Sequence, residues 1–129
     1  MLRALVEAAL SVLLAPLCAV CGVVLPRPLD GAVCAECWAR VARFSPPWCA
    51  TCGEPLPSAR SAPAGRCQPC SVALGAARHA RAVGAFDGRL ADVVHALKYG
   101  RRPSVAPPLA ALMRVAARDL AGAIEVVVP

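Results

Sequence analysis

The apolar residues of the first 17 positions recur with the spacing of a helix. Arg3, Glu7 and Ser11 fall between them, on the other side of such a helix. The pattern predicts an amphipathic helix within residues 1–17 that packs against the rest of the chain and ends at Pro16. The apolar positions are Leu2, Leu5, Val6, Ala9, Leu10, Leu13 and Leu14.

A signal peptide or a membrane anchor would also begin with an apolar stretch. Glu7 interrupts the apolar run, however, and no cleavage site of the Ala-x-Ala kind precedes Cys18. A spanning helix is disfavoured because Pro16 and the first cysteine pair lie within the uncharged stretch of residues 8–25. We therefore expect a packing helix and no membrane span.

The sequence of the middle of the chain predicts short elements joined by proline-rich segments. Residues 34–44 predict a short helix with Trp38 facing inward. Residues 45–48 form a rigid linker that contains two prolines, and residues 57–66 form a loop rich in proline, serine and alanine.

After residue 70 the pattern becomes that of an α/β protein. The expected elements are a strand at 81–86, a helix that ends near 98–100, a helix at 109–120 and a strand at 124–128. The last of these is apolar enough for a buried parallel strand, which is normally covered on both faces. Nothing follows to complete such a sheet, so we expect the α/β segment to be incomplete.

The chain carries eight cysteines, and all of them lie in four Cys-x-x-Cys pairs. The phrases CAVCGVVLP (18–26) and CATCGEPLP (49–57) are copies of one another, and each is followed by a plainer pair. This internal repeat indicates two tandem modules with four thiolates each, which match one tetrahedral zinc ion per module. The two predicted ligand sets are Cys18, Cys21, Cys34 and Cys37, and then Cys49, Cys52, Cys67 and Cys70.

Other roles of the cysteines fit the spacing less well. Short Cys-x-x-Cys pairs are poor geometry for a disulfide framework, and a thioredoxin-like pair occurs singly beside a βαβ unit. Iron stays open, because a four-cysteine site of this kind also accepts it. His79 and His95 are not needed as ligands. Gly22 and Gly53, which follow the second cysteine of each leading pair, are expected to have positive φ.

The metal sites change the charge balance. The formal net charge of +6 falls to +2 once eight thiolates and two Zn²⁺ ions are included. Attraction for phosphate should therefore lie in the C-terminal part, where basic residues are in excess. The candidate phosphate or nucleic-acid contacts are Lys98, Arg101 and Arg102, with Arg78 and Arg81 as secondary candidates. Three cations that follow a helix C-terminus can also be solvated, stabilising charges and nothing more.

The order of these motifs resembles the N-terminal half of ComF-type competence proteins, a family related to phosphoribosyltransferases. The resemblance is carried by the doubled zinc knuckles and by the phrases Phe86-Asp87-Gly88 and Leu97-Lys98-Tyr99. It implies a zinc-stapled double zinc ribbon (18–75) after the N-terminal helix (1–17), followed by the incomplete start of a phosphoribosyltransferase-like α/β domain (76–129).

The resemblance also implies a function. The intact protein would serve DNA uptake in the cytoplasm, contacting single-stranded DNA and other competence proteins. Alternatives are a truncated phosphoribosyltransferase of nucleotide metabolism and a zinc-ribbon adaptor between proteins. The residues that would hold phosphoribosyl pyrophosphate in that family lie beyond Pro129, so no catalytic residue is assigned and this chain is expected to be inactive.

Overall fold

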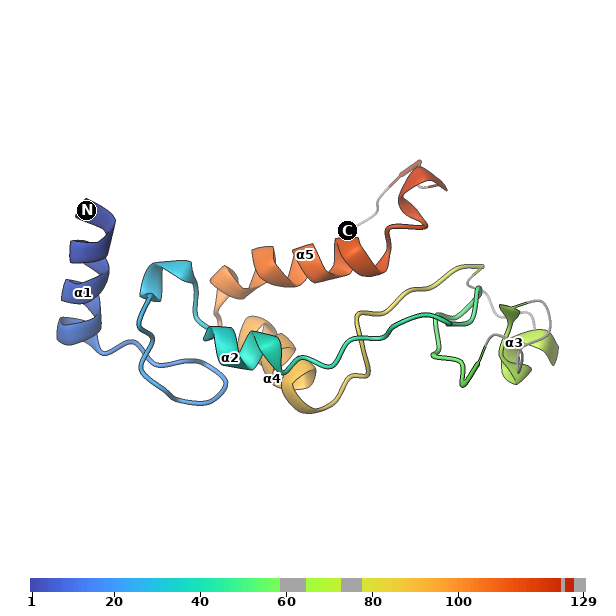
Figure 1. Cartoon of the computed structure of the whole chain (residues 1–129), viewed down its shortest axis with the longest axis horizontal. Coiled ribbons are helices and arrows are strands. Elements are labelled where there is room, and N and C mark those ends of the chain that lie inside the picture. Colours follow the sequence, from blue (N-terminus) through green and yellow to red (C-terminus); the bar gives the residue numbers. More distant parts are fainter. Residues whose placement is uncertain (59–64, 73–77, 124, 127–129) are drawn as a thin grey trace. The chain divides into compact units, whose positions relative to one another are not determined.

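The computed structural model describes residues 1–58, 65–72, 78–123 and 125–126. The chain divides into two compact units, and each contains one cysteine module. The first unit comprises Met1–Ala42 and Phe86–Leu109, and the second comprises Arg43–Ala85 and Ala110–Pro129. Figure 1 labels the helices of the two units.

The first unit contains the apolar core. It holds α1 (Leu2–Leu14), the 3₁₀ turn η1 (Pro28–Asp30), α2 (Ala35–Ala39), α4 (Gly88–Lys98), η4 (Pro103–Val105) and the start of α5 (Ala106–Ala116). Its largest fully buried side chains include Val93 and Val105. The other buried apolar residues of this unit are Leu25, Val33, Val41, Leu90, Ala96 and Leu109.

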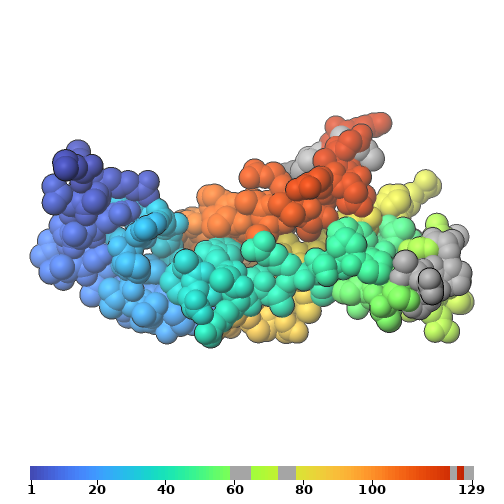
Figure 2. All heavy atoms as spheres, in the orientation of Figure 1, coloured from blue at the N-terminus to red at the C-terminus, as the bar shows by residue number. Residues whose placement is uncertain are grey.

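The α1 helix is present as its residue spacing predicts, and it ends in a left-handed cap at Ala15, just before Pro16. The expectation that its leucines pack inward is wrong, because α1 has no buried side chain (dark blue in Figure 2). Its polar side makes the contacts instead: Arg3 pairs with Asp30 of η1, and the Ser11 hydroxyl donates to the Leu25 carbonyl at 3.2 Å. The partners beside α1 are thus a carboxylate and a carbonyl, which pair with its polar side chains.

The second unit has much less apolar core. Its described helices are α3 (Gln68–Val72), the later part of α5 and η5 (Ala121–Ala123). Among the described residues of this unit, Cys49 is the buried member of the core. The unit therefore depends on contacts other than apolar packing, and these are found around its cysteines.

The predicted helices are confirmed with changed bounds. The expected 34–44 helix is shortened to α2. Pro107 and Pro108 lie in the first turn of α5, as the sequence allows before the expected 109–120 helix, and α5 ends at Ala116. The α4 helix ends at Lys98 as expected. The predicted loop at 57–66 lies mostly outside the described residues.

The predicted strand at 81–86 is wrong. Within the described residues the only β-pairing is two isolated antiparallel bridges, Leu17–Val24 and Trp48–Pro55. To the described backbone, the 81–86 segment instead makes a single hydrogen bond, from Phe44 N to Val83 O at 2.9 Å. A strand needs a partner along its length, and no described segment provides one. The 124–128 strand lies largely outside the described residues, so the described chain does not show an α/β domain.

Candidate metal centres

The two cysteine modules fold into the same loop. In the first module, Cys18 N donates to Val23 O at 2.8 Å and Gly22 N donates to Cys18 O at 2.9 Å. In the second module the equivalent bonds, Cys49 N to Glu54 O and Gly53 N to Cys49 O, have the same lengths. The sequence repeat is therefore a structural repeat.

Glycine at the turn of each loop is explained by the backbone. Gly22 has φ 73° and Gly53 has φ 75°, in the left-handed region where side chains are unfavourable, which confirms the sequence prediction. Gly53 has a second constraint, because a Cβ atom there would lie 2.7 Å from the backbone oxygen of Ala80. No such contact exists at Gly22.

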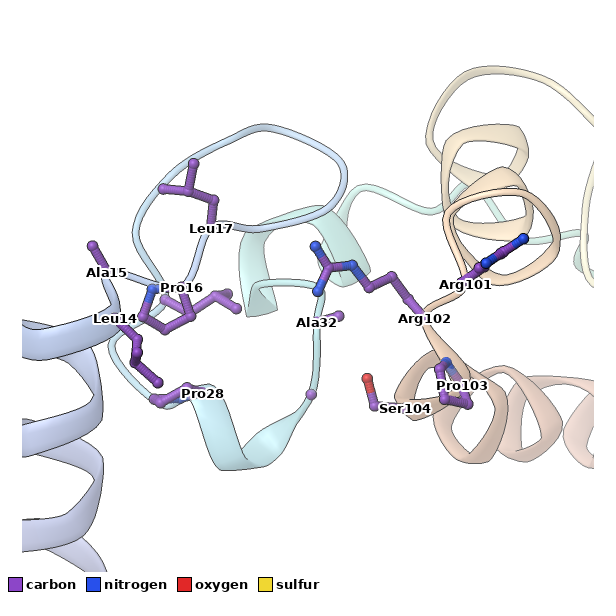
Figure 3. A pocket seen from close by; sticks show the side chains of 12 residues that line it. Leu14, Ala15, Pro16, Leu17, Pro28, Ala32, Arg101, Arg102, Pro103 and Ser104 are labelled. Atoms are coloured by element: carbon purple, nitrogen blue, oxygen red, sulfur yellow. The ribbon is translucent and has the colours of Figure 1, made fainter.

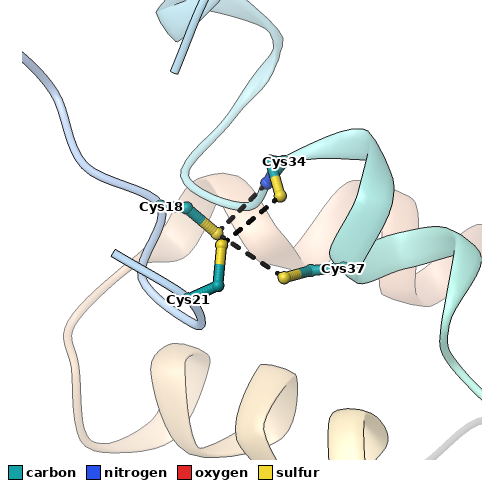
Figure 4. A group of neighbouring side chains, drawn as sticks. All are labelled: Cys18, Cys21, Cys34 and Cys37. Carbon is teal, nitrogen blue, oxygen red and sulfur yellow. Dashed lines mark hydrogen bonds between the residues drawn. The ribbon is translucent and has the colours of Figure 1, made fainter. Parts of the chain in front are cut away.

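The four sulfur atoms of each module converge. Within each set all Sγ atoms lie within 4.8 Å of one another, and ligands do not cross between modules. Figure 4 shows the first set, Cys18, Cys21, Cys34 and Cys37, with the side chains turned toward a common centre.

The sulfur separations fit zinc rather than disulfides. The Cys18–Cys37, Cys21–Cys34 and Cys52–Cys67 Sγ pairs lie 3.9, 3.7 and 3.6 Å apart. A disulfide would need about 2.05 Å. Four ligands at about 2.3 Å in a tetrahedron lie about 3.8 Å from each other. The two groups of four cysteines therefore fit two zinc ions, as the sequence predicts.

Backbone N–H groups stabilise one thiolate in each set. Burial raises the pKa of Cys18, but hydrogen bonds from the backbone around Cys34, Cys21 and Val20 outweigh it and lower the pKa to about 6. Cys49 has the same balance of burial against backbone donors, and its pKa is also about 6. The Cys34 N donor lies 3.3 Å from Cys18 Sγ.

Other cysteines hold their protons more tightly. Burial, followed by the neighbouring thiols, raises the pKa of Cys37, and hydrogen bonds with Cys52 and Cys67 raise the pKa of Cys70 to about 12. Four thiolates cannot share so small a volume without a cation. Zinc binding must therefore displace protons from these sulfurs.

The two histidines stand apart from the cysteine clusters, as expected. A ring nitrogen of His79 lies 3.3 Å from the Ala50 carbonyl, and the ring of His95 packs against Phe86 and Tyr99. Neither belongs to the ligand groups.

Arg81 is a structural residue of the second unit that the sequence did not reveal. Its side chain is 9% exposed, and it donates to the Asp119 carboxylate from Nη2 at 2.5 Å and from Nε at 3.0 Å. Nη1 donates to the carbonyls of Ala50 and Ala80 at 3.2 and 2.7 Å. The guanidinium carbon also lies 5.9 Å from the ring centroid of Trp48. Because these groups occupy the guanidinium, Arg81 is not free to bind phosphate, and that secondary candidate is wrong.

The basic cluster of Lys98, Arg101 and Arg102 lies at the end of α4. Arg101 has a left-handed backbone (φ 53°), and Arg102 N donates to Ala96 O at 3.2 Å, which closes the helix end. All three side chains are exposed.

The part of the chain that resembles known proteins is the pair of cysteine modules. No curated protein and no solved structure matches the chain. Within the described residues no helix is long and apolar enough to cross a membrane. A family profile described as "Double zinc ribbon domain" matches residues 9–76, which include every cysteine of the chain. Because this match covers more than half of the chain, the protein belongs to the double zinc ribbon domain family.

Proposed function

We propose that this zinc-ribbon protein is the N-terminal region of a ComF-like protein and contacts single-stranded DNA during DNA uptake in the cytoplasm. The resemblance to ComF-type competence proteins is the reason for proposing DNA uptake as the process. The observation that carries the proposal is the basic cluster, in which Lys98, Arg101 and Arg102 make no ion pair with any described residue. By contrast, the surface residues Arg3 and Arg40 pair with carboxylates.

A pocket of about 520 Å³ lies beside this cluster in the first unit. Figure 3 shows the Arg102 guanidinium reaching toward Pro16 and Ala32, while Arg101 points the opposite way. Ser104 adds a hydroxyl to the lining, and none of the lining residues is acidic. A guanidinium and a hydroxyl in the lining of one pocket, without a carboxylate in that lining, are suited to phosphate oxygens.

The experiment is a titration of zinc-loaded chain with a fluorescent single-stranded oligonucleotide at several salt concentrations. Each phosphate contact contributes roughly 0.7 to the slope of log affinity against log salt. We expect Arg102→Ala to weaken binding and to lower this slope by about 0.7. The matched control is Arg114→Ala on α5, which removes an exposed arginine outside the basic cluster. Binding that does not depend on salt, or equal effects of the two variants, would contradict the proposal.

An adaptor between proteins is the second candidate. It is favoured by the exposed apolar side chains of α1, where Leu2, Leu5 and Leu13 are each more than two-thirds exposed. An adaptor would bind its partner through α1 with little dependence on salt. The salt titration above separates the two candidates, because only the first predicts salt-dependent binding to the oligonucleotide. That binding should not respond to Leu13→Ser.

A further inference from the structure

Two aromatic side chains of the first unit are exposed to solvent. Phe86 is 64% exposed and Tyr99 is 76% exposed. The other aromatic residues outside the histidines, Phe44, Trp38 and Trp48, are intermediate in their exposure. Exposing a large aromatic ring forfeits the free energy of its burial, so two such rings together need an explanation.

The two rings are joined by a third. The His95 ring stands edge-on to Phe86, with ring centroids 5.6 Å apart and an interplanar angle of 80°. It lies 5.5 Å from the Tyr99 ring at an angle of 49°. The three residues therefore form one continuous group, which we call the aromatic cluster.

The α4 helix holds this cluster at the surface. Leu90, Val93 and Ala96 are buried, so they fix the face of α4 that packs inward. His95 and Tyr99 are four residues apart and lie together on an exposed face, one turn above the other. The buried face of α4 thus leaves His95 and Tyr99 on the exposed side of the helix.

Positive charge adjoins the rings. Lys98 precedes Tyr99, and Arg101 and Arg102 follow it, so the basic cluster begins where the aromatic cluster ends. On the same helix Asp92 is engaged by Arg89 at 3.4 Å. Asp87 is the remaining acidic residue of this segment, and it follows Phe86 at the start of α4, at the other end of the helix from the basic cluster.

We propose that Phe86, His95 and Tyr99 form a stacking platform for the bases of single-stranded DNA, whose phosphates the adjoining basic cluster contacts. This inference rests on the proposed function, since it names the part of the DNA that a second group of residues recognises. Exposed rings beside unpaired cations suit a strand that offers both bases and phosphates. A duplex hides the faces of its bases, and an apolar protein surface does not complement the cations.

The platform is tested with two oligomers of equal length, an oligothymidine and its abasic counterpart, titrated against the zinc-loaded chain. We expect the wild type to prefer the oligothymidine. Tyr99→Ala should reduce affinity for it roughly five-fold or more, the lower end for one stacked base. Affinity for the abasic strand and the salt slope should stay unchanged. Tyr99→Phe should retain the preference, because it keeps the ring.

The matched control is Leu5→Ala, which removes an exposed apolar side chain of similar accessibility on α1. Zinc content and circular dichroism of each variant verify the fold. A strand containing 5-iododeoxyuridine should crosslink to Tyr99 or Phe86 on irradiation.

Three outcomes would overturn the inference. Equal affinity of the wild type for the two oligomers removes the platform, leaves the phosphate contacts standing and assigns the rings to a protein surface. A Tyr99→Ala effect of equal size on both oligomers shows a structural role of the ring. Absence of salt-dependent binding to either strand overturns the proposed function together with the platform.

Discussion

Gly22 and Gly53 occupy equivalent turns with nearly the same φ, yet their surroundings differ. Substitution of Gly22 by alanine should lower the stability of the first site only by the cost of holding a side chain in the left-handed conformation, about 1–2 kcal/mol. Alanine at Gly53 meets that penalty and also the 2.7 Å approach to Ala80 O, so we expect a larger loss. The difference between the two variants isolates the backbone contact.

Competition with a chromophoric zinc chelator measures this difference at each site. Gly53→Ala should release the second zinc ion at a lower chelator concentration than Gly22→Ala releases the first, after each is normalised to the wild-type site. Equal shifts would mean that the Ala80 segment moves aside freely.

Arg81 should stabilise the second unit through its hydrogen bonds to the Ala50 and Ala80 carbonyls. Its substitution by methionine keeps much of the apolar stem and removes the donors, and we expect a loss of about 1–3 kcal/mol. Thermal unfolding of the zinc-loaded chain measures it. The control Arg118→Met, at an exposed position nearby, should change stability by less than about 0.5 kcal/mol.

The ion pair between Arg81 and Asp119 has a defined pH dependence. Hydrogen bonding with Arg81 lowers the pKa of Asp119 below its ordinary value of 3.8. The contribution of the pair is therefore complete above pH 3.8 and is lost as the pH falls through the lower pKa of the folded state. Acid unfolding of Arg81→Met should lack this step, and a wild-type step at higher pH would contradict the assignment.

At the scale of elements, a helix can be present without the packing that its pattern suggests. Leu5 of α1 is 68% exposed, whereas Leu25, which follows the Cys18–Cys21 loop, is 4% exposed. We expect Leu25→Ala to destabilise the first unit by about 2–5 kcal/mol and Leu5→Ala by less than about 0.5 kcal/mol. Hydrogen exchange at α4 measures both, and equal losses would show that α1 is packed in solution.

The metal sites could be predicted from sequence because zinc chemistry is local and repetitive. Four thiolates at fixed spacing, copied once, leave little choice of ligand sets. The helices, including the end of α4 near Lys98, followed from apolar periodicity and helix-stop signals. The strand at 81–86 failed because β structure depends on a partner that a local pattern does not contain.

Contacts between residues that are distant in the sequence could not be predicted either. Arg81 and Asp119 lie on segments with no common pattern, so the sequence alone does not show that Arg81 has a carboxylate partner. His95 and Tyr99 share a helix face by spacing alone, but their exposure depends on which side the core of the first unit occupies.

At the scale of the whole molecule, the two units differ in what holds them together. Apolar side chains such as Val93 and Val105 support the first unit, whereas the described core of the second unit is Cys49. Zinc binding in small peptides contributes an apparent 10–16 kcal/mol or so, at least as much as the roughly 5–15 kcal/mol stability of a typical domain. The second unit should therefore depend on its metal more completely than the first.

Removal of zinc tests this asymmetry, with Cys52→Ser and Cys21→Ser as a matched pair that each remove one exposed ligand. We expect Cys52→Ser to abolish amide protection across residues 49–56 while α4 stays protected. Cys21→Ser should weaken the protection of α4 without abolishing it, because Leu90, Val93 and Ala96 remain packed in the apolar core. A chelator titration of the wild type should likewise unfold the second unit first. If both units lost protection in a single transition, the zinc ions would hold one cooperative fold, and the apolar core of the first unit would be insufficient without its metal.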